Sequence, residues 1–81
     1  MTNDDTLREL IQDILLLEPG EYSMGLKRTE VPTWDSLAVV SIAVGLEETF
    51  GYHPSPEEAT ALRSVADIVR LLESRGLTFD G

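Results

Sequence analysis

Residues 34–51 read WDSLAVVSIAVGLEETFG, and this segment decides the fold because it predicts the central helix. Asp35 or Ser36 starts that helix, since short polar side chains cap helix N-termini, and Gly51 ends it. The helix is therefore predicted over residues 36–50. Apolar residues recur along it at the spacing of a buried face, namely Val39, Ile42, Ala43, Leu46 and Phe50.

A second apolar row lies on the same helix beside Ser36 and consists of Leu37, Val40 and Val44. One helix in so small a domain rarely buries its whole circumference. The row is either partly exposed, which would mark a contact surface, or its first members cover the preceding loop. The sequence leaves both readings open.

A first helix is predicted over about residues 5–17, with apolar residues at helical spacing at Leu7, Leu10, Ile11, Ile14 and Leu17. Its start is open between a capping box of Thr6 with Glu9 and a start at Asp4 or Asp5.

Two further helices follow the central one. The segment Ser55-Pro56-Glu57-Glu58 combines a capping serine, an early proline and a glutamate at the third position, and predicts a short helix over residues 56–61. Ser64 starts the last helix, over residues 65–75. Residues 18–35 form a long loop. The expected fold is all-α: a small four-helix bundle, with three main helices and a short third one, in a single domain over residues 1–81.

Composition narrows the possible functions. The 81 residues carry 15 acidic and 6 basic side chains, a net charge of −9, which disfavours nucleic acid and anionic membranes as partners. No segment is long and apolar enough for a membrane span, and the N-terminus lacks a secretory signal, so a cytoplasmic location is expected. The absence of cysteine means that any thiol chemistry must be supplied covalently from outside.

Ser36 is the candidate functional residue. At the first turn of a helix its hydroxyl lies beside backbone N–H groups without intrahelical partners, and the helix dipole favours an attached phosphate. No histidine lies near it in sequence, so Ser36 is interpreted as an attachment point rather than a nucleophile.

Several motifs resemble those of acyl carrier proteins and related phosphopantetheine-binding carriers. Asp35-Ser36-Leu37 is similar to the attachment motif of that family, and Leu46-Glu47-Glu48-Thr49-Phe50-Gly51 is similar to its LEE-x-FG close of the second helix. The resemblance extends through Ser55-Pro56-Glu57-Glu58 to the start of the last helix, and spans residues 7–76.

The resemblance implies a covalent 4′-phosphopantetheine on Ser36, transferred from coenzyme A by a separate Mg²⁺-dependent phosphopantetheinyl transferase. Acyl or aminoacyl groups would be loaded onto its thiol by a ligase and passed to synthases or transferases. Asp35 would orient the serine, meet the transferase and cap the helix, with Leu37 beside it. The chain itself would catalyse nothing.

Departures from the family pattern favour a stand-alone carrier of a specialised pathway. Ala38 and Ser41 stand where carriers of fatty-acid synthesis usually have acids, Trp34 replaces a smaller residue, and no glycine-rich run precedes Ser36. The cargo stays open between acyl and aminoacyl. Residues expected to face an inter-helix cleft, where a short chain could enter or which could stay collapsed, are Val40, Ala43, Val44, Leu62 and Ile68.

Between Arg28 and Arg63 the chain has six acidic residues and no basic one, which suits partners with basic docking faces. The residues expected to meet partners are Val40, Val44, Glu47, Glu48, Glu57 and Glu58, on a monomer without a metal site.

Two other classes of function can be compared with that of a carrier. An unmodified acidic helical interaction module would use the same surface. A serine hydrolase is disfavoured, because the single histidine, His53, is predicted about 25 Å from Ser36 at the far end of the helix.

Overall fold

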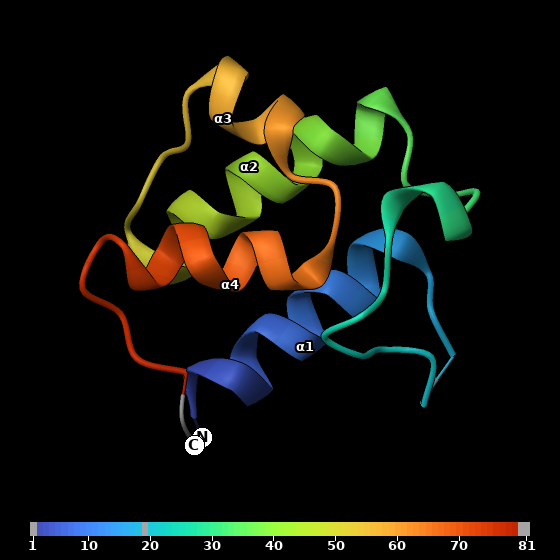
Figure 1. The fold of residues 1–81 in the computed structure, drawn as a ribbon, viewed down its shortest axis with the longest axis horizontal. Coiled ribbons are helices and arrows are strands. Elements are labelled where there is room, and N and C mark those ends of the chain that lie inside the picture. Colours follow the sequence, from blue (N-terminus) through green and yellow to red (C-terminus); the bar gives the residue numbers. More distant parts are fainter. Residues whose placement is uncertain (1, 19, 80–81) are drawn as a thin grey trace.

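The computed structural model describes residues 2–18 and 20–79 and confirms the all-α fold. Its elements are α1 (Asn3–Leu15), a short 3₁₀ helix η1 (Arg28–Glu30), α2 (Ser36–Phe50), α3 (Pro56–Ala61) and α4 (Val65–Glu73). In Figure 1, α4 crosses the centre in front of α2, with α1 below and α3 above.

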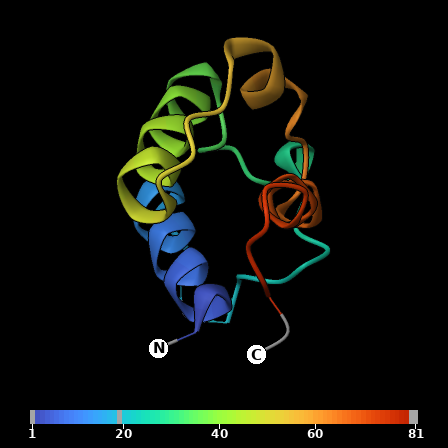
Figure 2. The ribbon, with the colours of Figure 1, turned by 90° about the vertical axis from the view of Figure 1, so that its left-hand side faces the viewer.

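The helices enclose one apolar core. α1 packs against α2, and α2 packs against α3. Figure 2 shows α4 nearly end-on, across from the wall that α1 and α2 form together. The most deeply buried side chains come from α1, α2 and α4 and include Leu7, Ile11, Ile42, Leu46, Ile68 and Leu72. The predicted inner face of α2 is confirmed, although Phe50 is only partly buried and packs at the edge of the core.

α1 lies two residues earlier than the expected range of 5–17. Thr2, rather than Thr6, Asp4 or Asp5, caps it, because its side chain accepts a 3.1 Å hydrogen bond from the N–H of Asp5. The helix ends at Leu15, because Leu16 adopts a left-handed conformation with φ 57° and the Thr33 hydroxyl binds the Leu15 carbonyl at 2.6 Å.

The remaining helices begin at the predicted residues. Ser55 and Glu58 form the expected capping box at the start of α3, and Ser64 caps α4 by accepting from the N–H of Asp67 at 3.1 Å. α4 stops at Glu73 instead of residue 75, because the N–H groups of residues 74–77 turn back onto its last carbonyls.

The long loop before α2 is tied to the connection between α3 and α4. Lys27 and Ser64 form an isolated antiparallel bridge, within which the Arg28 N–H donates to the Arg63 carbonyl at 2.7 Å. The Val65 N–H donates to the Leu26 carbonyl at 3.0 Å. In the described residues the loop therefore contains one helical turn and one bridge but no strand, and it is fixed against the body of the protein.

Candidate functional site

Ser36 is the first residue of α2 and is exposed. Asp35 caps the helix as expected, because its carboxylate accepts a 3.0 Å hydrogen bond from the N–H of Ala38. The Asp35 carbonyl also accepts from the N–H of Val39 at 3.0 Å. Within the described residues neither the Ser36 hydroxyl nor the N–H groups of Ser36 and Leu37 have a protein partner. The hydroxyl is thus presented to solvent at the positive end of a helix.

The loop directly before Ser36 is anchored by Trp34. The Trp34 side chain is only 3% exposed and belongs to the apolar core. The backbone N–H of Trp34 donates to the Val31 carbonyl at 3.0 Å. The Arg28 Nε–H donates to the Trp34 carbonyl at 3.1 Å. Trp34 is held by core packing and by hydrogen bonds, and Asp35 by its bond to Ala38, so the backbone that leads into Ser36 is anchored.

The second apolar row of α2 is exposed. Leu37, Val40 and Val44 retain 75%, 59% and 45% of their accessible surface. Of the two readings that the sequence left open, the structure therefore supports a solvent-facing row that starts next to Ser36. Such an exposed apolar row is a surface on which a partner can bury apolar area.

A groove of about 230 Å³ lies between α2 and the start of α3. Its lining is mainly apolar and includes Val40, Ala43 and Val44, as the sequence suggested. Leu62 and Ile68 do not line it, which corrects the expectation for these two residues. Both are buried in the core, because they face inward from the end of α3 and from α4.

The four glutamates expected on the partner-facing surface differ in their surroundings. Glu48 and Glu57 are exposed. Glu47 is also exposed, and its Oε2 lies 2.6 Å from Nδ1 of His53. Glu58 instead joins α3 to the rest of the fold.

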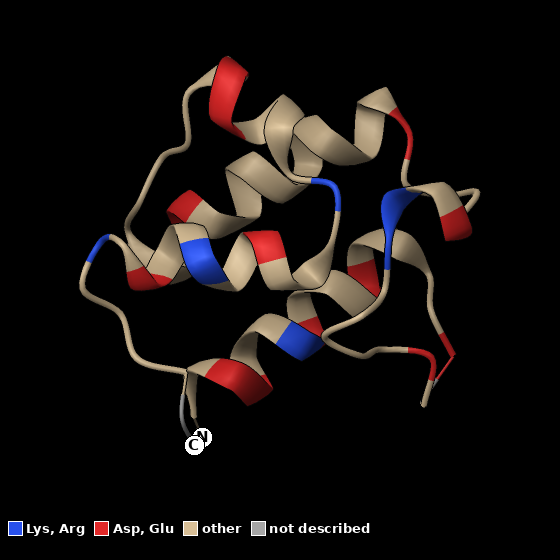
Figure 3. Cartoon of the chain, viewed as in Figure 1, with Lys and Arg blue, Asp and Glu red and all other residues tan. Residues whose placement is uncertain are grey.

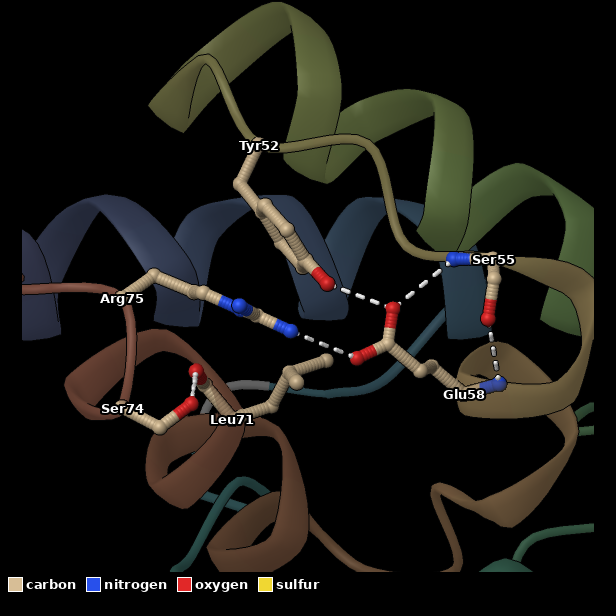
Figure 4. Close-up of polar contacts among 6 residues, drawn as sticks. All are labelled: Tyr52, Ser55, Glu58, Leu71, Ser74 and Arg75. Carbon is tan, nitrogen blue, oxygen red and sulfur yellow. Dashed lines mark hydrogen bonds and ion pairs between the residues drawn. The ribbon is translucent and has the colours of Figure 1, made fainter.

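Figure 4 shows the Glu58 carboxylate between Tyr52 and Ser55, in the connection from α2 to α3, and Arg75, which follows α4. It accepts from the Tyr52 hydroxyl at 2.5 Å, from the Ser55 N–H at 3.0 Å and from Arg75 at 3.1 Å. These contacts lower the pKa of Glu58 to about 2, and the hydrogen bond from Tyr52 has the largest effect. The same hydrogen bond raises the pKa of Tyr52 above its ordinary value. Glu58 thus has a structural role. The sequence pattern indicated only its part in capping the start of α3.

The hydrolase alternative finds no support in the geometry. His53 pairs with Glu47, which lies roughly 17 Å along α2 from Ser36 at 1.5 Å per residue. His53 therefore does not reach the serine hydroxyl as a general base.

A shallow depression of about 160 Å³ adjoins Ser36, and its lining includes Arg28, Val40 and Thr60. In the sequence, Arg28 stands out only as the edge of an acidic segment. Its position beside Ser36 depends on the bridge between the loop and the α3–α4 connection, for which no local sequence signal exists.

Residues 2–18 and 20–79 contain neither a membrane-spanning helix nor a cluster of metal ligands. Every helix there is too short or too polar to cross a lipid bilayer. Within the same residues, no three histidine or carboxylate side chains gather as ligands for a metal ion.

Several known proteins are similar in sequence to this chain. No family model matches the chain. It is 35% identical to the acyl carrier protein of Campylobacter curvus, over 89% of this chain and 94% of that protein. It is 34% identical to the acyl carrier protein of Wolinella succinogenes, over 86% and 92% of the two chains. It is 31% identical to the meromycolate extension acyl carrier protein of Mycolicibacterium aurum, over 83% and 69%.

These identities extend over most of both chains and agree with the helical fold and with the exposed serine at the start of α2. The chain belongs to the acyl carrier protein family.

Proposed function

We propose that the chain is a single carrier domain that bears a 4′-phosphopantetheine arm on Ser36 and shuttles acyl or aminoacyl thioesters between enzymes. The observation that carries the proposal is the exposed Ser36 hydroxyl at the first position of α2, held by the Asp35 cap. The family membership supports the same conclusion, since the relatives are named as carriers.

The residues around Ser36 fit such a group. The hydroxyl is free of protein partners among the described residues, and the unpaired N–H groups of the first turn favour a phosphate there. When bound, the arm supplies the thiol that this cysteine-free chain lacks. The protein holds the attachment point still, and Asp35, beside it, is exposed to an approaching transferase.

The partner surface of the proposed carrier combines two features of the structure. The exposed row of Leu37, Val40 and Val44 offers apolar area next to the arm. Glu47, Glu48 and Glu57 supply negative charge on α2 and α3, which suits a transferase, ligase or synthase with a basic docking face. Glu58 is left out of this surface, because its carboxylate is bound within the fold.

We place the carrier in a dedicated, specialised pathway, because Ala38 and Ser41 put no charge on the first turns of α2. Ala38 is buried and Ser41 is half-buried, so neither position adds to the acidic surface. Loading assays with candidate ligases test this assignment. Equal loading by a fatty-acid synthesis ligase and by the specialised ones would remove its basis.

Mass spectrometry after incubation with coenzyme A, Mg²⁺ and a broad-specificity phosphopantetheinyl transferase tests the attachment. We expect one phosphopantetheine per chain, lost in Ser36→Ala and retained in Ser41→Ala, a serine of the same helix. A wild-type protein that stays unmodified with several transferases, or a modified Ser36→Ala, would overturn the proposal. The exposed row of α2 would then support an unmodified interaction module.

A further inference from the structure

The six basic residues of the chain divide into two groups of three. One group forms ion pairs on the surface, in the pairs Arg8–Asp5, Arg70–Asp67 and Arg75–Glu58. Within the described part of the chain, the other group makes no ion pair, and its members are Lys27, Arg28 and Arg63. Half of the positive charge of a protein with net charge −9 is therefore not neutralised by a neighbouring carboxylate.

The backbone segments that carry these three residues lie side by side. The antiparallel bridge between Lys27 and Ser64 brings the loop before α2 against the connection that carries Arg63, with the Arg28 N–H bound to the Arg63 carbonyl at 2.7 Å. Figure 3 shows these basic segments next to each other. Carboxylates lie at this bridge as well, because Glu30 Oε1 accepts from the Lys27 N–H at 3.3 Å and Asp67 Oδ2 accepts from the Arg63 N–H at 3.1 Å.

Arg28 is the member of the group that lies beside Ser36. It is half-buried, and its Nε–H is bound to the Trp34 carbonyl at 3.1 Å, which fixes the guanidinium against the anchored loop. Arg28 and Ser36 line the same depression, together with Thr60. Neither Asp35 nor Glu30, the carboxylates nearest in sequence, forms an ion pair with Arg28, since each accepts from a backbone N–H, of Ala38 and of Lys27 respectively.

We propose that Arg28 is a positioning residue that binds the phosphodiester carried by Ser36. The inference rests on the proposed function. The guanidinium has terminal N–H donors that the Trp34 carbonyl does not use, and their fork matches the oxygens of a phosphate. Binding there would lead the base of the arm along the depression between α2 and α3, rather than leave it free in solvent.

The test compares thermal unfolding of the apo and phosphopantetheinylated forms of wild type, Arg28→Gln and Arg63→Gln. Each variant has its own apo form as reference, so the loss of the Arg28–Trp34 hydrogen bond cancels. We expect attachment of the arm to raise the Tm of wild type by a few degrees, and Arg28→Gln to lose most of that rise. Arg63→Gln removes the same charge and should keep the rise.

A second readout is the phosphorus NMR resonance of the attached phosphodiester, which should move between wild type and Arg28→Gln and stay in place in Arg63→Gln. Should Arg28→Gln not fold, Arg28→Lys keeps the charge without the forked donors and should also move the resonance. Equal Tm rises and unchanged resonances in the Arg28 variants would overturn the inference. Equal losses in the Arg28 and Arg63 variants would overturn it too, in favour of a general field effect.

The two proposals fail in different ways. A wild-type protein that takes no arm removes the proposed function and this inference together. A wild-type protein that is modified on Ser36 but shows no Arg28-dependent change removes the inference alone.

Discussion

The carboxylate of Asp35 accepts a hydrogen bond of 3.0 Å from the N–H of Ala38, so the residue before Ser36 caps the helix that presents it. Serine is itself a preferred capping residue, and in the capping position its hydroxyl would be occupied by a backbone N–H. Because Asp35 takes that role, Ser36 becomes the first helical residue and its hydroxyl stays available. The order of these two residues therefore leaves the Ser36 hydroxyl free for the proposed attachment.

Replacing Asp35 by alanine should destabilise the protein by about 1 kcal/mol, because the cap of α2 is lost. Asp35→Asn is the matched control, since asparagine caps helices as well as aspartate does. Urea unfolding followed by circular dichroism measures both variants. Equal losses in the two variants would show that the charge of Asp35, and not its cap, is what stabilises the helix.

Among the side chains near Ser36, Trp34 should contribute most to the free energy of unfolding. Trp34→Ala should lower the free energy of unfolding by about 3–5 kcal/mol, because a side chain that is 3% exposed leaves a cavity. Trp34→Phe should cost much less. It keeps an aromatic ring and removes the indole N–H, which is buried without a partner among the described residues. Equal costs for the two variants in denaturant unfolding would contradict this account.

Gly45 of α2 lies against the Leu10 side chain of α1. A Cβ atom at this position would lie 2.7 Å from Cδ1 of Leu10. Gly45→Val should therefore destabilise the protein by about 1–3 kcal/mol through overpacking. Gly45→Ala should cost less, because the end of the Leu10 side chain can move and alanine favours the helix by about 1 kcal/mol. In a double-mutant cycle Leu10→Ala should relieve the effect of Gly45→Val, and strictly additive losses would exclude the contact as its cause.

The Glu58 carboxylate should contribute to acid unfolding. Its pKa is about 2 in the folded protein against an ordinary value of 4.5, because of its hydrogen bonds from Tyr52, Ser55 and Arg75. A lowered folded-state pKa means that the unfolded chain takes up the proton first as the pH falls. The stability that Glu58 provides is thus present above about pH 4.5 and is lost between that value and about pH 2. Glu58→Gln should flatten the pH dependence of the unfolding free energy in this window, and Glu57→Gln, at its exposed neighbour, should leave it unchanged.

Sequence patterns predicted the features that depend on residues close together in the chain. The starts of α2, α3 and α4 are such features, because in each a side-chain oxygen accepts from an N–H three residues further on. The periodicity that assigned Leu46 and Ile42 to the core also depends on a local property, the number of residues per helical turn.

The features that the sequence missed depend on contacts between distant residues. α1 ends early at Leu15 because the hydroxyl of Thr33 binds its last carbonyl. Glu58 is turned inward because Arg75 approaches it from beyond α4. Arg28 comes near Ser36 through the bridge to residues 63–64. No periodicity or capping rule describes such contacts.

Leu37 should separate partner binding from stability. Its side chain is 75% exposed and directly follows Ser36, so Leu37→Ala should change the free energy of unfolding by less than about 0.5 kcal/mol. A transferase that docks on the exposed row would lose apolar contact, and the rate of phosphopantetheine attachment at limiting carrier concentration should fall several-fold. Leu46→Ala is the opposite case, because Leu46 is fully buried and should lose about 2–5 kcal/mol of stability. An unchanged attachment rate in a folded Leu37→Ala would place the docking surface elsewhere on the protein.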